Sequence, residues 1–476
     1  MDLVTGRSST EIRRRPDHSQ IGNHGCDNMR ILFVPSMSGM GHTSRCLAIA
    51  EEYRERGGHV IAFVVQRDGP QAELVDDCGF AVFYALSRPK QLCAAPRPDP
   101  AFRAFWNNDH RFHVHGFLEP AFFEECLRQE LAVIREFQPD LIVCDWQITT
   151  MTSASICEIP IVQISQAQHH PEGLEWAEHH ARFDPVVLQT SLEPINAIRR
   201  KYGLRSVAKI SDLLGGQLHL VPSIPMLSPL TEGIARTVYV GNLLWRRRRK
   251  SASLRAGWQP ARSGDAILAY FGDYMRQDLY LAIVRALRAC PYKVYFLTQL
   301  KRFEISDAPN ISVVPWVEPI EDLYQSIKLV LWHGGHETAM RNVIHAVPGI
   351  VFPATTELEQ NGRYLQKFGA GEVLCPYRDF TSGLHRLAMP HLGKNTEMFG
   401  ISDWEISDDT IAETIDRVMN VPTYRTSMLA LSQVVNSYPG PSAVPEMIEH
   451  HLTVSSPEPN SLTSSDTWRP AGHAHG

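Results

Sequence analysis

Short apolar runs alternate along the chain with segments of helical period. Residues 30–35 and 59–65 are apolar runs of strand length, and residues 43–56 between them carry their apolar positions on one helical face. This strand–helix–strand order predicts a βαβ unit with parallel strands and a right-handed crossover. Further buried strands are expected at residues 141–144 and 159–164.

The alternation stops at residues 241–262 and then restarts. The break contains the charge run Arg246–Lys250 beside serine and glycine residues, and we expect an interdomain linker rather than a contact for acidic lipid or nucleic acid. Strand-length apolar runs recur after it, at residues 266–271, 292–297, 311–314, 329–332 and 349–352. Two such series predict an α/β protein with two Rossmann-like domains, whose ligands bind in the cleft that the carboxyl ends of the strands face.

Both ends of the chain are polar and are predicted to be disordered tails. Residues 1–28 hold only isolated apolar residues, and residues 453–476 are rich in Ser, Pro and Thr. The expected domains are therefore residues 29–240 and 263–452, joined by the linker at 241–262. The 476 residues then make two domains of about 200 residues each rather than three.

Composition excludes several classes of protein. With 43% hydrophobic and 21% charged residues, the chain is neither collagen-like nor wholly disordered. Its formal net charge of -6 gives no reason to expect a nucleic-acid partner. No apolar run reaches the roughly 18 residues that span a bilayer. The nine cysteines include no CxxC pair, and no apolar segment follows Arg13–Arg15 as in a signal peptide, so a cytoplasmic location is expected.

The segment Trp332–Thr338 (WHGGHET) is the strongest local feature. It follows an apolar run and opens a segment of helical period. Two glycines at a strand-to-helix turn let a ligand approach the backbone, and the helix N-terminus suits a phosphate or diphosphate. A tight packing turn fits the turn alone equally well. No zinc site is expected, because position 340 is Met rather than the second histidine of an HExxH motif.

A histidine and an aspartate stand at the ends of strands in the first domain. Gly41-His42 lies in a glycine-rich turn after the first strand, and Asp145 ends a later one. A carboxylate paired with an imidazole raises its basicity and fixes its tautomer, as a general base requires. The residues alone leave a capping or core role for His42 open.

These motifs together resemble those of nucleotide-sugar glycosyltransferases of the GT-B fold, nearest to family 1 and with some resemblance to family 28. The resemblance spans about residues 30–450 and is strongest in 311–374. It implies two Rossmann-like domains that face each other across a cleft, with His42 as the general base and Asp145 as its carboxylate partner. The implied donor-binding residues are Gly41, Gly272, Trp316, His333, Gly334, Gly335, His336, Glu337, Thr338, Glu357, Glu359 and Gln360.

The chain departs from the family pattern at three places on the donor side. Position 273 is Asp where the family has a diphosphate-binding Ser or Thr. Arg341 stands where many UDP-sugar enzymes carry a ribose-binding Glu, so UDP and dTDP both stay open. The acidic residue–Gln pair that holds donor sugar hydroxyls matches either Glu357 or the dipeptide Glu359-Gln360, and the sequence does not choose between them.

The resemblance implies inverting, metal-independent transfer of a hexose from a UDP- or dTDP-sugar to a small-molecule hydroxyl or amine, with natural-product biosynthesis as one setting. Donor and acceptor are the implied partners, no cofactor or nucleic acid is expected, and the oligomeric state is open. Alternatives are a nucleotide-sugar hydrolase, a non-hydrolysing epimerase, and a catalytically inactive sugar-nucleotide-binding protein. Arg45 supports the hydrolase, because many family 1 transferases have Pro there.

Two further groups of residues have an open role. The segment 101–125 is rich in Phe and His, and it either lines an apolar acceptor pocket or packs in the core. The pairs His169-His170 and His179-His180 are expected to face solvent rather than to bind a metal.

Overall fold

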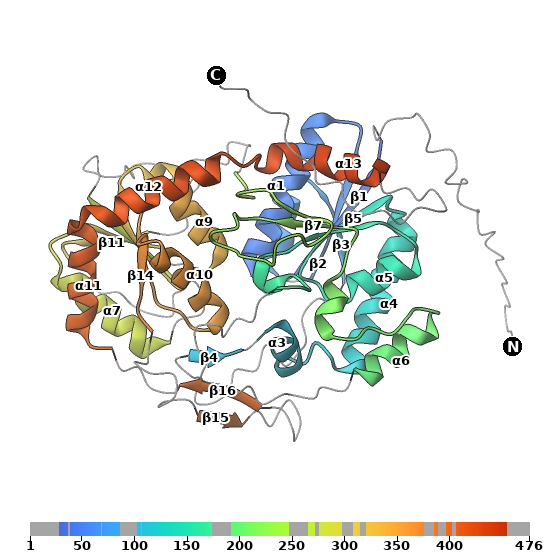
Figure 1. The fold of residues 1–476 in the computed structure, drawn as a ribbon, viewed down its shortest axis with the longest axis horizontal. Helices are drawn as coiled ribbons and strands as arrows, with labels where there is room; N and C mark the ends of the chain where they lie inside the picture. The colour runs from blue at the N-terminus through green and yellow to red at the C-terminus, as the bar shows by residue number, and fades with distance from the viewer. Residues whose placement is uncertain are drawn as a thin grey trace, which may run out of the picture.

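The structure is a computed structural model, and its two main sheets each belong to one βα series of the sequence (Figure 1). It describes residues 28–36, 39–67, 69–85, 102–105, 107–173, 192–246, 265–271, 276–297, 308–314, 320–375, 385–388, 397–401 and 406–454.

The first sheet has seven parallel strands in the order β3-β2-β1-β5-β6-β7-β8. These strands are β1 (Arg30–Pro35), β2 (Val60–Val65), β3 (Ala81–Tyr84), β5 (Leu141–Asp145), β6 (Ile161–Ile164), β7 (Leu218–Val221) and β8 (Thr237–Tyr239). Strand β1 lies between β2 and β5, so the order reverses there. Ligands of open α/β sheets bind beyond the carboxyl ends of the strands at such a reversal.

Helices cover this sheet and flank its carboxyl edge. They are α1 (Met40–Arg56), α2 (Pro70–Asp77), α3 (Asn108–Val114), α4 (Pro120–Phe137), α5 (Thr150–Ile156) and α6 (Glu193–Lys201), with 3-10 turns η3 (Ala167–His169) and η5 (Ile210–Leu214). Helix α1 begins three residues before the predicted start, so His42 lies in its first turn.

The second sheet has six parallel strands in the order β11-β10-β9-β12-β13-β14. They are β9 (Ala266–Tyr270), β10 (Val294–Leu297), β11 (Ile311–Val314), β12 (Ile327–Trp332), β13 (Gly349–Val351) and β14 (Gly371–Val373). The associated helices are α7 (Gln277–Ala289), α8 (Ile320–Tyr324), α9 (His336–Ile344), α10 (Thr356–Lys367), α11 (Asp408–Asn420) and α12 (Pro422–Asn436).

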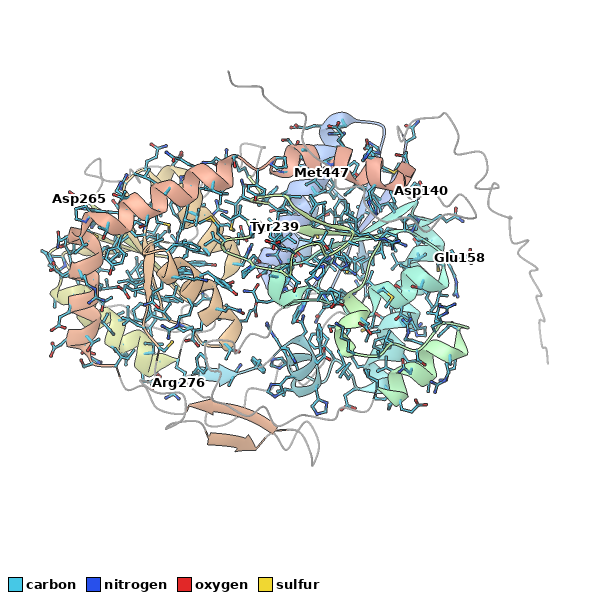
Figure 2. The ribbon with its side chains drawn as sticks, viewed as in Figure 1. Asp140, Glu158, Tyr239, Asp265, Arg276 and Met447 are labelled. Atoms are coloured by element: carbon cyan, nitrogen blue, oxygen red, sulfur yellow. The ribbon has the colours of Figure 1, made fainter. Side chains whose placement is uncertain are left out.

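Two segments connect the halves in addition to the linker. Strand β4 (Phe102–Ala104) pairs with β16 (Glu397–Ile401), which pairs with β15 (His385–Ala388), and both pairings are antiparallel. Near the C-terminus, η8 (Pro441–Ala443) leads into α13 (Val444–Val454), which crosses back over the first domain (Figure 1). Met447 of α13 packs into the apolar core that also holds residues of β1 and α1 (Figure 2). Each domain therefore holds a segment that belongs to the other half of the sequence.

The predicted strands are confirmed to within two residues at each end, and the two parallel α/β sheets confirm the predicted fold class. Residues 1–27, 247–264 and 455–476 lie outside the described residues, so the tails and most of the linker stay predictions. No helix in the described part of the chain combines the length and apolar character needed to cross a bilayer.

Candidate active site

The fold brings His42 and Asp145 together at the carboxyl edge of the first sheet. Strands β1 and β5 are neighbours with Pro35 opposite Asp145, and the Ser36 N–H donates to the Asp145 carbonyl over 2.8 Å. Helix α1 starts just beyond this edge. His42 Nδ1 lies 2.7 Å from Asp145 Oδ1, and Asp145 is fully buried. His42 and Asp145 are thus in direct contact, which the sequence alone could not establish.

Arg45 completes this cluster from one turn further along α1. Its Nε donates to Asp145 Oδ2 over 2.7 Å, and its Nη2 donates to Oδ1 over 3.0 Å. Burial alone would raise the pKa of Asp145, but the charges of Arg45 and His42 lower it to about 2. Because Asp145 is ionised near neutral pH, the short contact requires a proton on His42 Nδ1, which leaves Nε2 as the basic nitrogen.

Aromatic rings fix the orientation of the His42 imidazole. Trp146 has a φ of 60°, an uncommon conformation for a bulky residue, and its ring stacks 5.6 Å from that of His42. His169 stacks on both, at 4.9 Å from Trp146 and 5.9 Å from His42. Asn108 of α3 accepts a hydrogen bond from Trp146 Nε1. The His42 imidazole is therefore packed against the rings of Trp146 and His169.

The glycine-rich turn of the second domain opens α9. Gly334 has a φ of +99°, and a Cβ there would lie 2.3 Å from the Leu358 carbonyl oxygen, so a side chain is excluded. Asn361 fixes the turn by donating to the Gly334 carbonyl over 2.9 Å. Gly335 is the N-cap of α9 and offers no side chain to its first amides. Those amides and the dipole of α9 can therefore receive an anion.

His336, the first residue of α9, is half-buried, and both of its ring nitrogens are shielded from solvent. Neither of its ring nitrogens has a hydrogen-bond partner among the described residues. Burial, and then the charges of Arg45 and His169, lower the pKa of His336 to about 3. Burial also lowers the pKa of His333 to about 4. Neutral imidazoles offer a ligand one donor and one acceptor each.

Glu337 connects the two domains beside this turn. Its Oε1 accepts from Ser44 Oγ of α1 over 3.0 Å and from Arg341 Nη2 over 3.1 Å. A Cβ on Gly41 would lie 3.5 Å from Glu337 Oε2. Arg341, at the family's ribose position, also pairs with Glu321. The carboxylate at the start of α9 is thus compensated by a cation and a hydroxyl donor.

Glu357 faces the first domain from the first turn of α10. It pairs with Arg111 of α3, and its Oε1 lies 3.3 Å from His169 Nε2. Burial would raise the pKa of this carboxyl, but Arg111 and His169 hold it well below its usual range. Glu357 therefore carries a negative charge close to the His42–Asp145 pair.

The other two candidates for the sugar contact bond within the second domain. Glu359 pairs with Arg363 over 2.8 Å and accepts from the Cys375 thiol. Gln360 donates to the Tyr364 hydroxyl over 3.0 Å. Glu359 is thus engaged within the second domain, whereas Glu357 faces the first domain and Gln360 Oε1 is buried with no hydrogen-bond partner among the described residues.

Several expectations have different outcomes. Gly272 and Trp316 lie outside the described residues, as do His179-His180. The expectation that His169 and His170 face solvent is wrong, since they are 2% and 4% exposed. Buried phenylalanines of segment 101–125 pack into apolar cores, and a role of this segment in an acceptor pocket stays a prediction; they are Phe102, Phe112, Phe117 and Phe123. Among the described residues, no group of three or more His, Cys, Asp and Glu could hold a metal.

Sequence reasoning missed Arg111 and His169 as site residues. His169 lies in η3, just beyond the carboxyl end of β6, which is the edge that carries Asp145. Its position after a predicted strand could have marked it as a site residue. The adjacent pair His169-His170 instead led to the expectation of a solvent-facing segment. Arg111 carries no such signal, because it reaches the site from an insertion after β4.

The sequence relatives of the chain are glycosyltransferases, although no family model matches it. A glycosyltransferase of PGL/p-HBAD biosynthesis from Mycobacterium tuberculosis (strain ATCC 25177 / H37Ra) is 24% identical over 273 residues, covering 53% of this chain and 63% of the relative. A PGL/p-HBAD biosynthesis rhamnosyltransferase from Mycobacterium bovis (strain BCG / Pasteur 1173P2) is 24% identical and covers 72% of this chain and 76% of the relative. The demethyllactenocin mycarosyltransferase of Streptomyces fradiae is 24% identical, and the match covers 86% of this chain and 85% of the relative. The chain thus spans less than two thirds of the length of the first relative, and more than two thirds of the length of the other two.

Solved structures of natural-product glycosyltransferases share the fold. The kitacinnamycin glycotransferase has a TM-score of 0.65 at 18% identity, and covers 89% of this chain and 99% of its own. The spinosyn rhamnosyltransferase SpnG, complexed with thymidine diphosphate, has a TM-score of 0.61 at 16% identity. The match covers 88% of this chain and 100% of the SpnG chain. The chain therefore has the GT-B fold of these structures, and its sequence relatives are glycosyltransferases.

Proposed function

We propose that the protein is a glycosyltransferase that moves a hexose from a UDP- or dTDP-sugar to a hydroxyl or amine of a small-molecule acceptor. One observation carries this proposal: a histidine–carboxylate pair in one domain faces an anion-receptive helix start in the other. The hydrogen bond from Ser44 to Glu337 joins the two helices that carry these groups. Such a site can bind a diphosphate and deprotonate a nucleophile at the same time.

The chemical step is a displacement at the anomeric carbon. His42 Nε2 takes the proton of the acceptor hydroxyl or amine while the acceptor atom forms a bond to that carbon. The bond from the carbon to the diphosphate oxygen breaks, and its electron pair leaves with the diphosphate. The amides at the start of α9, with the Thr338 hydroxyl, stabilise the growing charge. We propose inversion at the carbon and no need for a metal or cofactor.

Glu357 is our candidate for the donor sugar contact. Its charged carboxylate lies between Arg111, His169 and the His42–Asp145 pair, where sugar hydroxyls can donate to it. His336, whose ring nitrogens have no hydrogen-bond partner among the described residues, interacts electrostatically with His169, Asp145 and Glu357. Buried polar atoms are nearly always hydrogen-bonded, so a polar ligand is expected to bind there.

The donor nucleotide is tested first as dTDP. The SpnG structure was solved with thymidine diphosphate. Arg341 is paired with Glu321 and Glu337 at the place where many UDP-sugar enzymes have a ribose-binding Glu. None of the described cysteines forms a disulfide bond, which supports a reducing compartment such as the cytoplasm.

Nucleotide binding tests the donor half of the proposal. Thymidine diphosphate or uridine diphosphate should raise the Tm and bind measurably by calorimetry. Thr338→Val removes a hydroxyl donor and should weaken this binding about 5–10-fold, the effect of roughly 1 kcal/mol. Thr426→Val, at an exposed site on α12, is the control. Binding of neither nucleotide, or equal binding by both variants, would contradict the assignment.

Hydrolysis of the nucleotide sugar is the second candidate, because Arg45 contacts the catalytic pair directly. Release of the nucleotide with water alone would favour it. Release that depends on an acceptor fraction would favour transfer, and binding without turnover would indicate an inactive binding protein.

A further inference from the structure

The guanidinium of Arg45 contacts both members of the His42–Asp145 pair. It is 4% exposed, and its guanidinium bonds both oxygens of Asp145. The Nη2 atom also lies 3.0 Å from His42 Nδ1. Since Nδ1 carries a proton, two N–H groups converge on Asp145 Oδ1, and a cation lies against the imidazole.

We propose that Arg45 is a positioning residue of the His42–Asp145 pair, because it fixes the plane of the Asp145 carboxylate and thereby holds His42 in one tautomer. This inference rests on the function proposed above. It adds a third member to the pair, and the effect that it assigns to this member is geometric.

The geometric effect follows from the shape of the guanidinium. A planar fork with two parallel N–H bonds fixes the plane of a carboxylate far better than a single bond does. Asp145 then has one orientation in which Oδ1 accepts from His42 Nδ1. Nε2 remains the basic nitrogen, on the opposite side of the ring from Asp145.

Histidine 15N NMR of the whole protein tests this effect without a substrate. The His42 signals are identified by their absence in His42→Asn. In the wild type, His42 should be the Nδ1–H tautomer. In Arg45→Met the carboxylate loses the fork that fixes its plane, and the 15N shifts should move toward a mixture of the two tautomers. Arg45→Lys keeps the cation but not the planar fork, and it should give a similar mixture.

Arg199→Met is the matched control. Arg199 is another buried arginine of the first domain, 5% exposed, and it bonds Thr152 and the Arg205 carbonyl rather than the pair. It should leave the His42 tautomer unchanged. A pure Nδ1–H tautomer in Arg45→Met or Arg45→Lys, or an Nε2–H tautomer in the wild type, would overturn the inference. Arg45→Lys keeps the inference testable if Arg45→Met does not fold. Failure of the function proposal appears instead in the turnover assays, which this spectrum does not use.

Discussion

At the residue scale, the account depends on His42 as a base. Its Nδ1 is engaged by Asp145, and its ring is held by Trp146 and His169. Replacing it with Ala removes the proton acceptor and should lower kcat by about 10²–10⁴-fold. The assay is nucleotide release in the presence of acceptor. His59→Ala, just before β2 at the opposite edge of the sheet, should keep wild-type turnover, and similar rates in both variants would argue against the assignment.

Glu357 provides a second prediction at this scale. Glu357→Gln keeps the shape of the side chain but loses the charge that would accept from sugar hydroxyls. A hydrogen bond to a charged group contributes about 1.5–3 kcal/mol, so kcat/KM for the donor should fall roughly 10–100-fold. Glu359→Gln, which loses a pairing with Arg363, should affect kcat/KM far less. A larger loss in Glu359→Gln would move the sugar contact to that residue.

At the element scale, the carboxyl of Glu130 links α4 to the start of α5. It accepts hydrogen bonds from Thr149 and Ser153, over 2.5 and 2.7 Å, and burial raises its pKa to about 7. Between its ordinary pKa and 7 the folded protein keeps a proton that the unfolded chain has lost. This contribution to stability is therefore full below about pH 4.5 and disappears as the pH rises through 7.

Glu130→Gln should remove this pH dependence. Between pH 5 and 8, the wild type should lose about 1–3 kcal/mol of unfolding free energy relative to the variant, as the size of the pKa shift implies. Denaturant unfolding at several pH values measures the difference. Glu136→Gln, exposed on the same helix, should follow the wild type. Parallel curves for wild type and Glu130→Gln would show that Glu130 does not titrate in this range.

Strand β4 gives another prediction at this scale. Phe102 is fully buried in the core of the second sheet, although it precedes most of the first domain's strands in sequence. Phe102→Ala should cost about 3–5 kcal/mol and increase hydrogen exchange in β9 and β12. Leu281→Ala, at an exposed site on α7, should change stability by less than about 0.5 kcal/mol. Faster exchange confined to the first sheet would contradict this packing.

At the scale of the whole molecule, the two sheets could be predicted because parallel strands are buried on both faces. They therefore appear as short continuous apolar runs. Strand β4 could not be predicted, because its three residues pair with β16 from the other half of the chain. The early start of α1 was also missed, since Gly39 and Gly41 have low helix propensity and packing against β1 and β5 overrides it.

The site divides in the same way. Residues that follow or end strands within one domain, such as His42 after β1 and Asp145 at the end of β5, could be named as candidates from order along the chain, but their contact could not. Contacts between domains could not, and these include Arg111 with Glu357 and Ser44 with Glu337. The net charge of -6 likewise says little about an anionic ligand, because amides and nearby cations set the local potential.

Transfer of the sugar itself is the central claim, and mass spectrometry tests it most directly. The protein is incubated with a 13C-labelled dTDP- or UDP-sugar and an acceptor fraction from a cell extract. The account predicts an acceptor species heavier by one labelled sugar residue with the wild type, and its near absence with His42→Ala. Labelled free sugar as the product in both the presence and the absence of acceptor would contradict it and identify a hydrolase instead.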